Sequence, residues 1–268
     1  MLKLLSREGH PHLNSLLTTY HQNKRFYLVF HWAEWDLWKY WEKHDPRLYG
    51  GDDCSVFWMV RECAGLASSL LKIHGPHDPA SFAHQNSFDT DIAEMTVTGT
   101  KTPGNATASA AEPPAPKLCH HGDIKAINIL VFSRPDTPPP ASSQASSQAA
   151  WPRHVDWTLK ISDFGMAGFH NPGREGTGKT TWTPAYVPPE WETRPESIDK
   201  LACDIWALGC VFLQFVGWYL GGFKMVEDFE KARVAEDGKK AFYYWLPAEH
   251  EDSETESALI KPSVKKVW

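Results

Sequence analysis

The stretch HHGDIKAINILVF (residues 120–132) decides the fold that we expect for this chain. Its polar first half holds Asp123 and Asn128, and its second half is apolar. Orienting a hydroxyl group requires a carboxylate, and binding magnesium requires oxygen ligands. This stretch supplies both on one loop, so it predicts a catalytic loop that leads into a short strand.

Three further blocks follow in order along the chain. The apolar strand TLKIS (158–162) runs into Asp163-Phe164-Gly165, where a carboxylate at the end of a strand can bridge a metal ion and phosphates. TPAYVPPE (183–190) and DIWALGC (204–210) come next. Each block is short enough to occur by chance, but four blocks in one order are hard to obtain by accident.

Together these blocks resemble the eukaryotic protein kinase family. The resemblance implies that Asp123 is the catalytic base, that Lys125 is the cation at the transferred phosphoryl group, and that Thr183 braces both. It implies that Asn128 and Asp163 are the magnesium ligands, with ATP and Mg as cofactors. A protein with a Ser or Thr hydroxyl is the implied substrate.

The Ser/Thr specificity is inferred from Lys125, two residues after the base, and from the T-x-x-Y pattern of TPAYVPPE. The Pro-, Ser- and Ala-rich insertions are similar to those of filamentous-fungal kinases. By the same likeness, Asp204 accepts hydrogen bonds from the backbone around His121, so we expect it to shape the catalytic loop without taking part in the chemistry.

The fold class implied by the resemblance is α+β, a protein kinase-like fold with a mostly helical large lobe and only a remnant of the small β lobe. We expect residues 1–268 to form a kinase domain truncated at both ends, with 1–35 as small-lobe remnant and hinge and 36–268 as large lobe. Segments 75–117 and 133–156 have the Pro, Ala, Ser and Thr content of disordered insertions.

Local patterns predict the main elements. Arg25 to Trp32 is rich in aromatic and β-branched residues, which predicts a buried strand paired in a hairpin with the segment before it. Apolar residues recur at helical spacing from Cys54 to His74, which predicts a helix with one broad buried face. The apolar run from Ile205 to Phe223 is long enough to span a bilayer, but we expect a buried central helix.

A nucleotide site is expected beside the linker that follows RFYLVF (25–30). Backbone groups near His31 and Ala33 are the expected partners of adenine, and Asp36 is within reach of the ribose. The alternative is that His31 and the neighbouring tryptophans are packing residues at the end of a strand.

Composition excludes several classes of function. The chain has 268 residues, 42% of them hydrophobic, and a net charge of -6 without a basic stripe, so we expect no nucleic-acid or membrane partner. Its five cysteines form no C-x-x-C pair, which argues against disulfides and a thiolate zinc site. With no apolar run of signal-peptide length at the start, the cytosol or nucleus is expected.

Two rival functions stay open. The sequence contains no glycine-rich phosphate loop, no strand lysine of the V-A-I-K type and no helix glutamate to pair with it. A pseudokinase-like binding module or an inactive kinase fragment is therefore the alternative. Small-molecule phosphotransferases share the H-G-D and N-I-L pattern, but they are not expected to have TPAYVPPE or DIWALGC.

Gly122 lies where many kinases carry an arginine that pairs with a phosphorylated activation loop. We therefore expect activation without phosphorylation, so that replacing Thr180 and Thr181 by Ala leaves phosphoryl transfer within about twofold of the unsubstituted chain. Initial rates of transfer to a Ser/Thr substrate measure this, and a collapse of activity in the double variant contradicts it.

Overall fold

The computed structural model describes residues 9–49, 53–76, 118–133, 157–170, 183–193, 198–246 and 257–266. Apart from Gly75, Pro76 and Ser133, the predicted insertions 75–117 and 133–156 lie outside these ranges. Ser133 is the last residue of a strand and pairs with Trp157.

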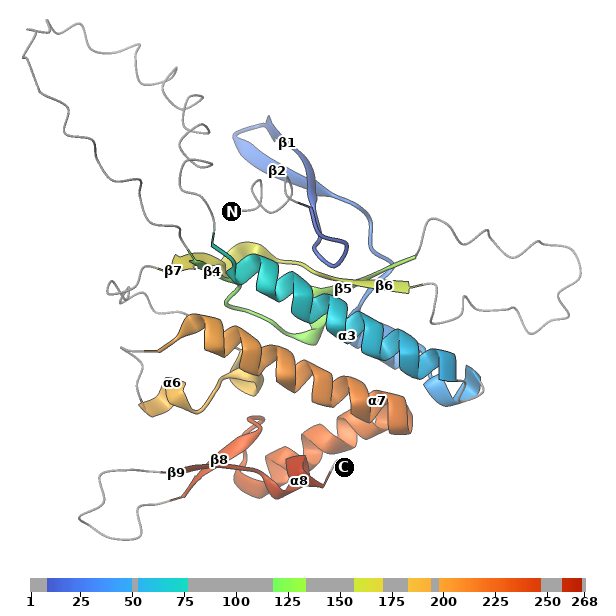
Figure 1. The fold of residues 1–268 in the computed structure, drawn as a ribbon, viewed down its shortest axis with the longest axis vertical. Helices are drawn as coiled ribbons and strands as arrows, with labels where there is room; N and C mark the ends of the chain where they lie inside the picture. The colour runs from blue at the N-terminus through green and yellow to red at the C-terminus, as the bar shows by residue number, and fades with distance from the viewer. Residues whose placement is uncertain are drawn as a thin grey trace, which may run out of the picture.

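The architecture is α+β, as predicted. Helices α3 (Asp53–His74) and α7 (Lys200–Asp237) lie side by side and contact each other (Figure 1). A three-stranded antiparallel sheet packs on α3 through strand β6, with β5 in the centre. Its strands are β3 (Trp35–Asp36), β5 (Ile129–Ser133) and β6 (Trp157–Ile161).

Shorter elements connect and flank this frame. Strand β4 pairs with β7, β8 pairs with β9, and short helices lie at most of the turns. Their bounds are β4 (Leu118–His120), β7 (Gly168–His170), β8 (Tyr243–Leu246), β9 (Ser257–Ile260), α2 (Leu37–Lys43), α6 (Glu190–Thr193), α8 (Pro262–Lys265) and the 3-10 helices η1 (Pro46–Tyr49), η3 (Ala126–Asn128), η5 (Phe164–Met166) and η6 (Pro184–Tyr186).

Aromatic side chains from three helices fill the core. Tyr40 and Trp41 on α2, Trp58 on α3, and Phe215 and Trp218 on α7 are buried and in ring contact. The indole of Trp218 donates to the carbonyls of Trp41 and His44, which lie at the end of α2. This satisfies the polar atom of a large buried ring and fixes α2 against α7.

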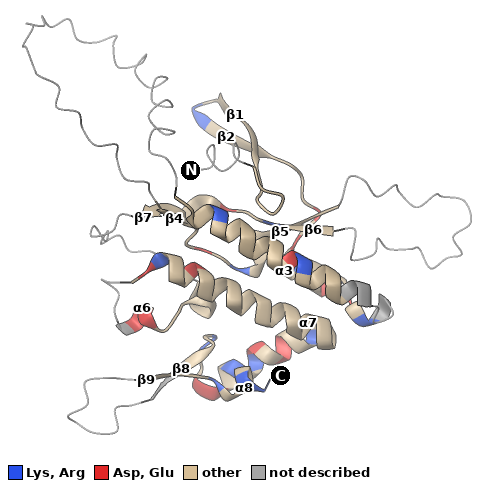
Figure 2. Cartoon of the chain, viewed as in Figure 1, with Lys and Arg blue, Asp and Glu red and all other residues tan. Residues whose placement is uncertain are grey.

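Helix α7 is the predicted central helix. It is long and apolar enough to cross a membrane by length and composition, but 56% of its most apolar window is buried inside the protein, as in a core helix. Figure 2 shows its first half almost free of charge and its last turns carrying both signs. The two parts meet at Gly222, whose φ of 70° is not helical, so a kink divides the helix.

The hairpin of β1 (Leu16–Gln22) and β2 (Arg25–Phe30) confirms the predicted strand pair but not its burial. Phe26 is 82% exposed and Leu28 is 52% exposed. Among the described residues no third strand extends this pair, so the aromatic content of β2 does not lead to burial. The expectation of a buried strand was wrong. Aromatic and β-branched residues favour a strand, but they do not determine whether other elements pack over it.

Helix α3 confirms the predicted helix, with a narrower buried face than expected. Trp58, Leu66 and Ile73 are buried, whereas Val60 and Leu71 are exposed. The buried stripe faces both α7 and β6, and the helix carries polar partners for β6 on the same stripe. Apolar periodicity alone therefore overestimated the width of the contact.

Lys261 anchors the last described segment to the end of α7. Its side chain is fully buried, and Nζ donates to the carbonyl oxygens of Arg233 and Lys239 at 2.8 Å and to Oδ1 of Asp237 at 2.6 Å. An ammonium group is favourable at a helix C-terminus because the last carbonyls carry partial negative charge. Each donor of this buried cation thus has an acceptor.

Replacing Lys261 by Met should lower the free energy of unfolding by about 3 kcal/mol, because the Asp237 carboxylate and two carbonyls lose a buried cation. Urea denaturation monitored by tryptophan fluorescence measures the change. Lys265→Met is the matched control at the end of α8, the helix that Lys261 precedes. The Lys265 side chain is exposed, and a change below about 0.5 kcal/mol is expected. Equal losses in the two variants contradict the assignment.

Candidate active site

Four side chains from the predicted set meet at one place. The carboxylate of Asp123 lies 2.7 Å from Lys125 Nζ, and it accepts hydrogen bonds from Thr183 Oγ1 at 3.0 Å and from Asn128 Nδ2 at 2.9 Å. Lys125 Nζ also donates to Thr183 Oγ1 at 3.1 Å. Thr183 thus contacts both Asp123 and Lys125, in the arrangement that the resemblance implied.

Asp204 holds the loop that carries this cluster. Its fully buried carboxylate accepts from the backbone N–H of His121 at 2.6 Å and of Gly122 at 2.8 Å. A buried carboxylate is stable when several donors satisfy it. The expectation that Asp204 binds the backbone around His121 is confirmed, since α7 presents this side chain to the loop as a fixed acceptor.

Gly122 is the point at which the loop turns. Its φ is +82°, and a Cβ at this position would lie 2.8 Å from the carbonyl oxygen of Met166. An L side chain is therefore opposed both by the left-handed backbone and by the close approach of η5. This gives a structural reason for glycine at the place where the resemblance leads one to expect arginine.

His121 connects the loop to the strand that precedes Asp163. Its ring Nε2 lies 3.0 Å from the carbonyl oxygen of Ser162, and the ring contacts Phe164 with centroids 5.1 Å apart. Burial lowers the pKa of His121, although the negative charges of Asp204, Asp123 and Asp163 oppose this. The imidazole is therefore neutral near pH 7 and serves as a packing and hydrogen-bonding group.

Asp163 lies at the end of β6 with a left-handed backbone, at φ 61°. Its side chain is exposed, and Oδ1 accepts from the N–H of Gly165 at 3.2 Å. The amide Nδ2 of Asn128 is used by Asp123, which leaves the amide oxygen of Asn128 available. A carboxylate and an amide oxygen suit a hard cation that keeps water and phosphate ligands, so the residues fit magnesium.

Within the described part of the chain, no three His, Cys, Asp or Glu side chains gather as metal ligands. Cys119 is fully buried in β4, and burial raises the pKa of its thiol to about 12, which opposes the thiolate form that binds zinc.

The structure separates the residues predicted to contact adenine and ribose. His31 lines a cavity of about 470 Å³ together with Trp32, Glu34, Phe132 and Lys160 among others, but Ala33 and Asp36 are not among its lining residues. Asp36 instead caps α2, since its Oδ1 accepts from the N–H of Lys39 at 2.8 Å.

Two tryptophans lie beside the linker, and the alternative interpretation was that they are packing residues. Trp35 packs in this way and Trp32 does not. The Trp35 ring lies 5.1 Å from that of Trp157 and 5.0 Å from that of His44, whereas Trp32 is 88% exposed. The linker thus presents Trp32 and His31 outward and anchors itself through Trp35.

Two partners of the site were missed at the level of sequence. His74, at the end of α3, places Nε2 3.0 Å from Asp204 Oδ2. Tyr186, within TPAYVPPE, donates its hydroxyl to Gln214, which is the polar residue inside the apolar run of α7. A polar residue that interrupts an apolar helix was the available clue for Gln214, whereas nothing in the sequence marked His74.

Comparison with known proteins supports a kinase assignment at a general level. Residues 116–241, just under half of the chain, match the family model described as protein kinase domain. The match spans the Asp123 loop, Asp163, Thr183 and Asp204, and it implies a kinase-like fold and, in general terms, a protein kinase activity. A search of curated proteins found no match.

Gly122→Ala should lower the free energy of unfolding by about 2 kcal/mol, because it combines a left-handed alanine with a clash against Met166. Thermal denaturation measures this change in the free energy of unfolding and needs no activity assay. Gly209 on α7 is the control of opposite sign, since a Cβ there meets nothing within 4 Å and alanine should stabilise the helix by about 0.5–1 kcal/mol. A neutral Gly122→Ala variant contradicts the assigned turn.

Proposed function

We propose that this protein transfers the terminal phosphoryl group of ATP to Ser or Thr hydroxyls of protein substrates. The observation that carries the proposal is the set of contacts around Asp123, whose carboxylate is held by Lys125, Thr183 and Asn128 on a loop fixed by Asp204. A carboxylate positioned in this way can accept a hydrogen bond from a substrate hydroxyl and orient its oxygen for attack.

The other members of the cluster have complementary tasks in this proposal. Lys125 balances the charge of Asp123 and can stabilise negative charge on the transferred group. Thr183 fixes the separation of Asp123 and Lys125 by bonding to both. Asn128 and Asp163 would hold magnesium, which when bound neutralises phosphate charge.

A binding module is the second candidate, and the lysines of residues 9–49 favour it. In residues 9–49, the lysines are Lys24 in the turn of the exposed hairpin and Lys39 and Lys43 on α2, so none lies on a strand as a partner for phosphates. Loss of one preorganised charge partner commonly lowers a rate by about a hundredfold. A chain with the cluster intact and no such lysine can retain partner binding with little turnover.

The setting that we propose is intracellular, in the cytosol or nucleus. Four cysteines whose side chains the structure describes are free, namely Cys63, Cys119, Cys203 and Cys210. Burial raises the pKa of Cys63 and Cys203 to about 12, so these thiols are unreactive as nucleophiles. Free thiols are typical of a reducing compartment.

Purified chain incubated with magnesium, ATP and a mixed Ser/Thr peptide library should incorporate phosphate on Ser and Thr. Asp123→Asn and Asp163→Ala should each lower the rate by about 100-fold or more, because one loses the base and the other a metal ligand. Phosphoamino-acid analysis of the products tests the specificity.

Asp228→Asn is the control for charge alone, because Asp228 is an exposed carboxylate on α7 that pairs with Lys224, and it should leave the rate unchanged. Transfer that survives both active-site substitutions contradicts the proposal. Folded protein without transfer, but with binding to a protein partner, establishes the binding module instead.

A further inference from the structure

The loop His10–Asn14 is docked on the open edge of β6. Leu13 forms a parallel bridge with Ile161 and is buried. The N–H of Ile161 donates to the carbonyl of His12 at 2.9 Å, and the N–H of Asn14 donates to the carbonyl of Ile161 at 2.8 Å. The loop is thus joined by backbone bonds to the strand that leads directly to Asp163.

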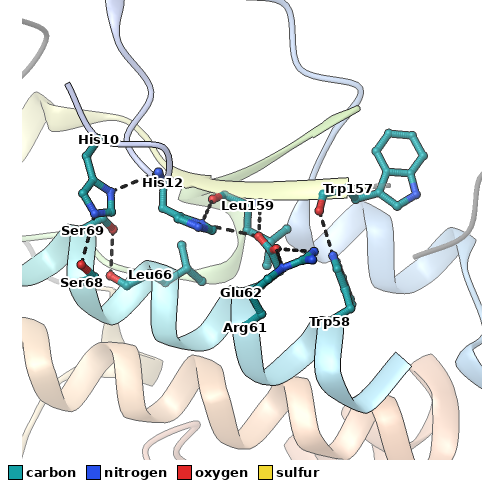
Figure 3. A network of polar contacts seen from close by, with 10 residues as sticks. All are labelled: His10, His12, Trp58, Arg61, Glu62, Leu66, Ser68, Ser69, Trp157 and Leu159. Carbon is teal, nitrogen blue, oxygen red and sulfur yellow. Dashed lines mark hydrogen bonds and ion pairs between the residues drawn. The ribbon is translucent and has the colours of Figure 1, made fainter. Parts of the chain in front are cut away.

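The His12 side chain lies between β6 and α3 (Figure 3). Its Nδ1 lies 2.8 Å from the carbonyl oxygen of Leu159, which requires a proton on this nitrogen. The ring covers Gly65 so closely that a Cβ there would lie 2.2 Å from the imidazole. Glycine at this position of α3 is therefore required for the loop to approach the helix.

Glu62 is the buried acidic group behind His12. Its carboxylate accepts from the N–H of Leu159 at 2.9 Å and from the guanidinium of Arg61 at 3.0 Å, and it lies 3.5 Å from His12 Nδ1. Because Arg61 and the backbone already satisfy this charge, Glu62 supports the docked loop without requiring a charged His12.

His10 uses both ring nitrogens, since Nδ1 bonds within the loop and Nε2 contacts α3. The N–H of His12 donates to Nδ1 of His10 at 3.1 Å, so this nitrogen must be unprotonated. Nε2 of His10 lies 3.2 Å from Ser68 Oγ and can donate to it. A proton on Nδ1 would replace the acceptor by a second N–H group facing the N–H of His12.

The charged groups around His10 oppose its protonation. Within the described residues, His12 in the same loop and Lys72 on α3 are the titratable groups that act on it. Glu62 lies beyond His12 and is engaged by Arg61. Among the described residues, no carboxylate acts on the His10 imidazole to stabilise its charged form.

We propose that residues 10–14 form a pH-sensitive latch, which stays docked on α3 and β6 while His10 is neutral and is released when His10 is protonated. Release would free the edge of the strand that positions Asp163 and would loosen the hairpin that follows the loop. The contacts that form the latch lie outside the Asp123 cluster, so the latch can be tested without measuring phosphoryl transfer.

The direction of the pH effect follows from the pKa of His10, which desolvation and the neighbouring His12 and Lys72 lower from its usual 6.5. A histidine with a lowered pKa in the docked form stabilises that form fully above pH 6.5. This stabilisation is lost as the pH falls below 6.5 and through the lowered value. The latch should therefore be closed at pH 7.5 and open in mild acid.

Hydrogen exchange of the Asn14 and Ile161 amides tests the latch directly. After correction for intrinsic exchange, protection of both amides should fall between pH 7.5 and pH 5, because a proton on His10 Nδ1 removes the acceptor of the His12 N–H. The amide of Phe215, in the fully buried part of α7, should keep its protection and so exclude global unfolding.

His10→Asn is the decisive variant. The oxygen of an Asn side chain accepts from the N–H two residues on, as in an Asx turn, so it can replace Nδ1 without titrating. We expect Asn14 protection in this variant to be independent of pH. Ser68→Ala should lower protection at both pH values and keep the pH dependence.

Three results would overturn the latch. The first is His10→Asn protein with the same pH dependence as the unsubstituted chain, which would assign the titration to another group. The second is protection of Asn14 that does not change from pH 7.5 to 5. The third is Ser68→Ala protein with unchanged Asn14 protection at both pH values, which would show that the contact between His10 and Ser68 does not hold the loop.

Discussion

The buried carboxylate of Asp204 is the interaction on which the candidate site depends. Burying a charge is costly unless donors surround it, and here His121 N, Gly122 N and His74 Nε2 all lie within 3.0 Å of its oxygens. These donors come from the catalytic loop and from the end of α3. The Asp204 side chain on α7 therefore fixes the catalytic loop and the end of α3. The position of Asp123 follows from the backbone of that loop.

Strand β6 plays a comparable positioning role for Asp163. It pairs with β5 on one edge and with the loop His10–Asn14 on the other, and its backbone N–H at Leu159 binds Glu62 of α3. Trp58 of α3 also donates to the carbonyl of Trp157. Asp163 follows this strand directly, so its carboxylate is placed by contacts that begin in three separate parts of the chain.

Sequence alone was sufficient for the elements whose information is local. The resemblance carried by the four ordered blocks implied the cluster of Asp123, Lys125, Asn128 and Thr183. Apolar periodicity predicted α3, and a nearly unbroken apolar run predicted the first half of α7. The burial of β2 could not be predicted, because it depends on what packs over the strand. The Asp204 partner His74 and the anchor Lys261 were also missed, since both act through contacts with residues distant in sequence. Asp36 was expected near the ribose but caps a helix, a role that its position before α2 also allowed.

The amino-terminal segment is attached to the rest of the protein at two places on either side of its hairpin. Residues 10–14 precede the hairpin and bind β6, while β3 follows it and pairs with β5. The hairpin itself exposes Phe26 and Leu28 and contributes its own strand pairing. Its position therefore depends on these two attachments, and both are made to the same sheet. Asn128 immediately precedes β5 and Asp163 follows β6. A change at either attachment therefore acts on the strands next to the candidate metal ligands.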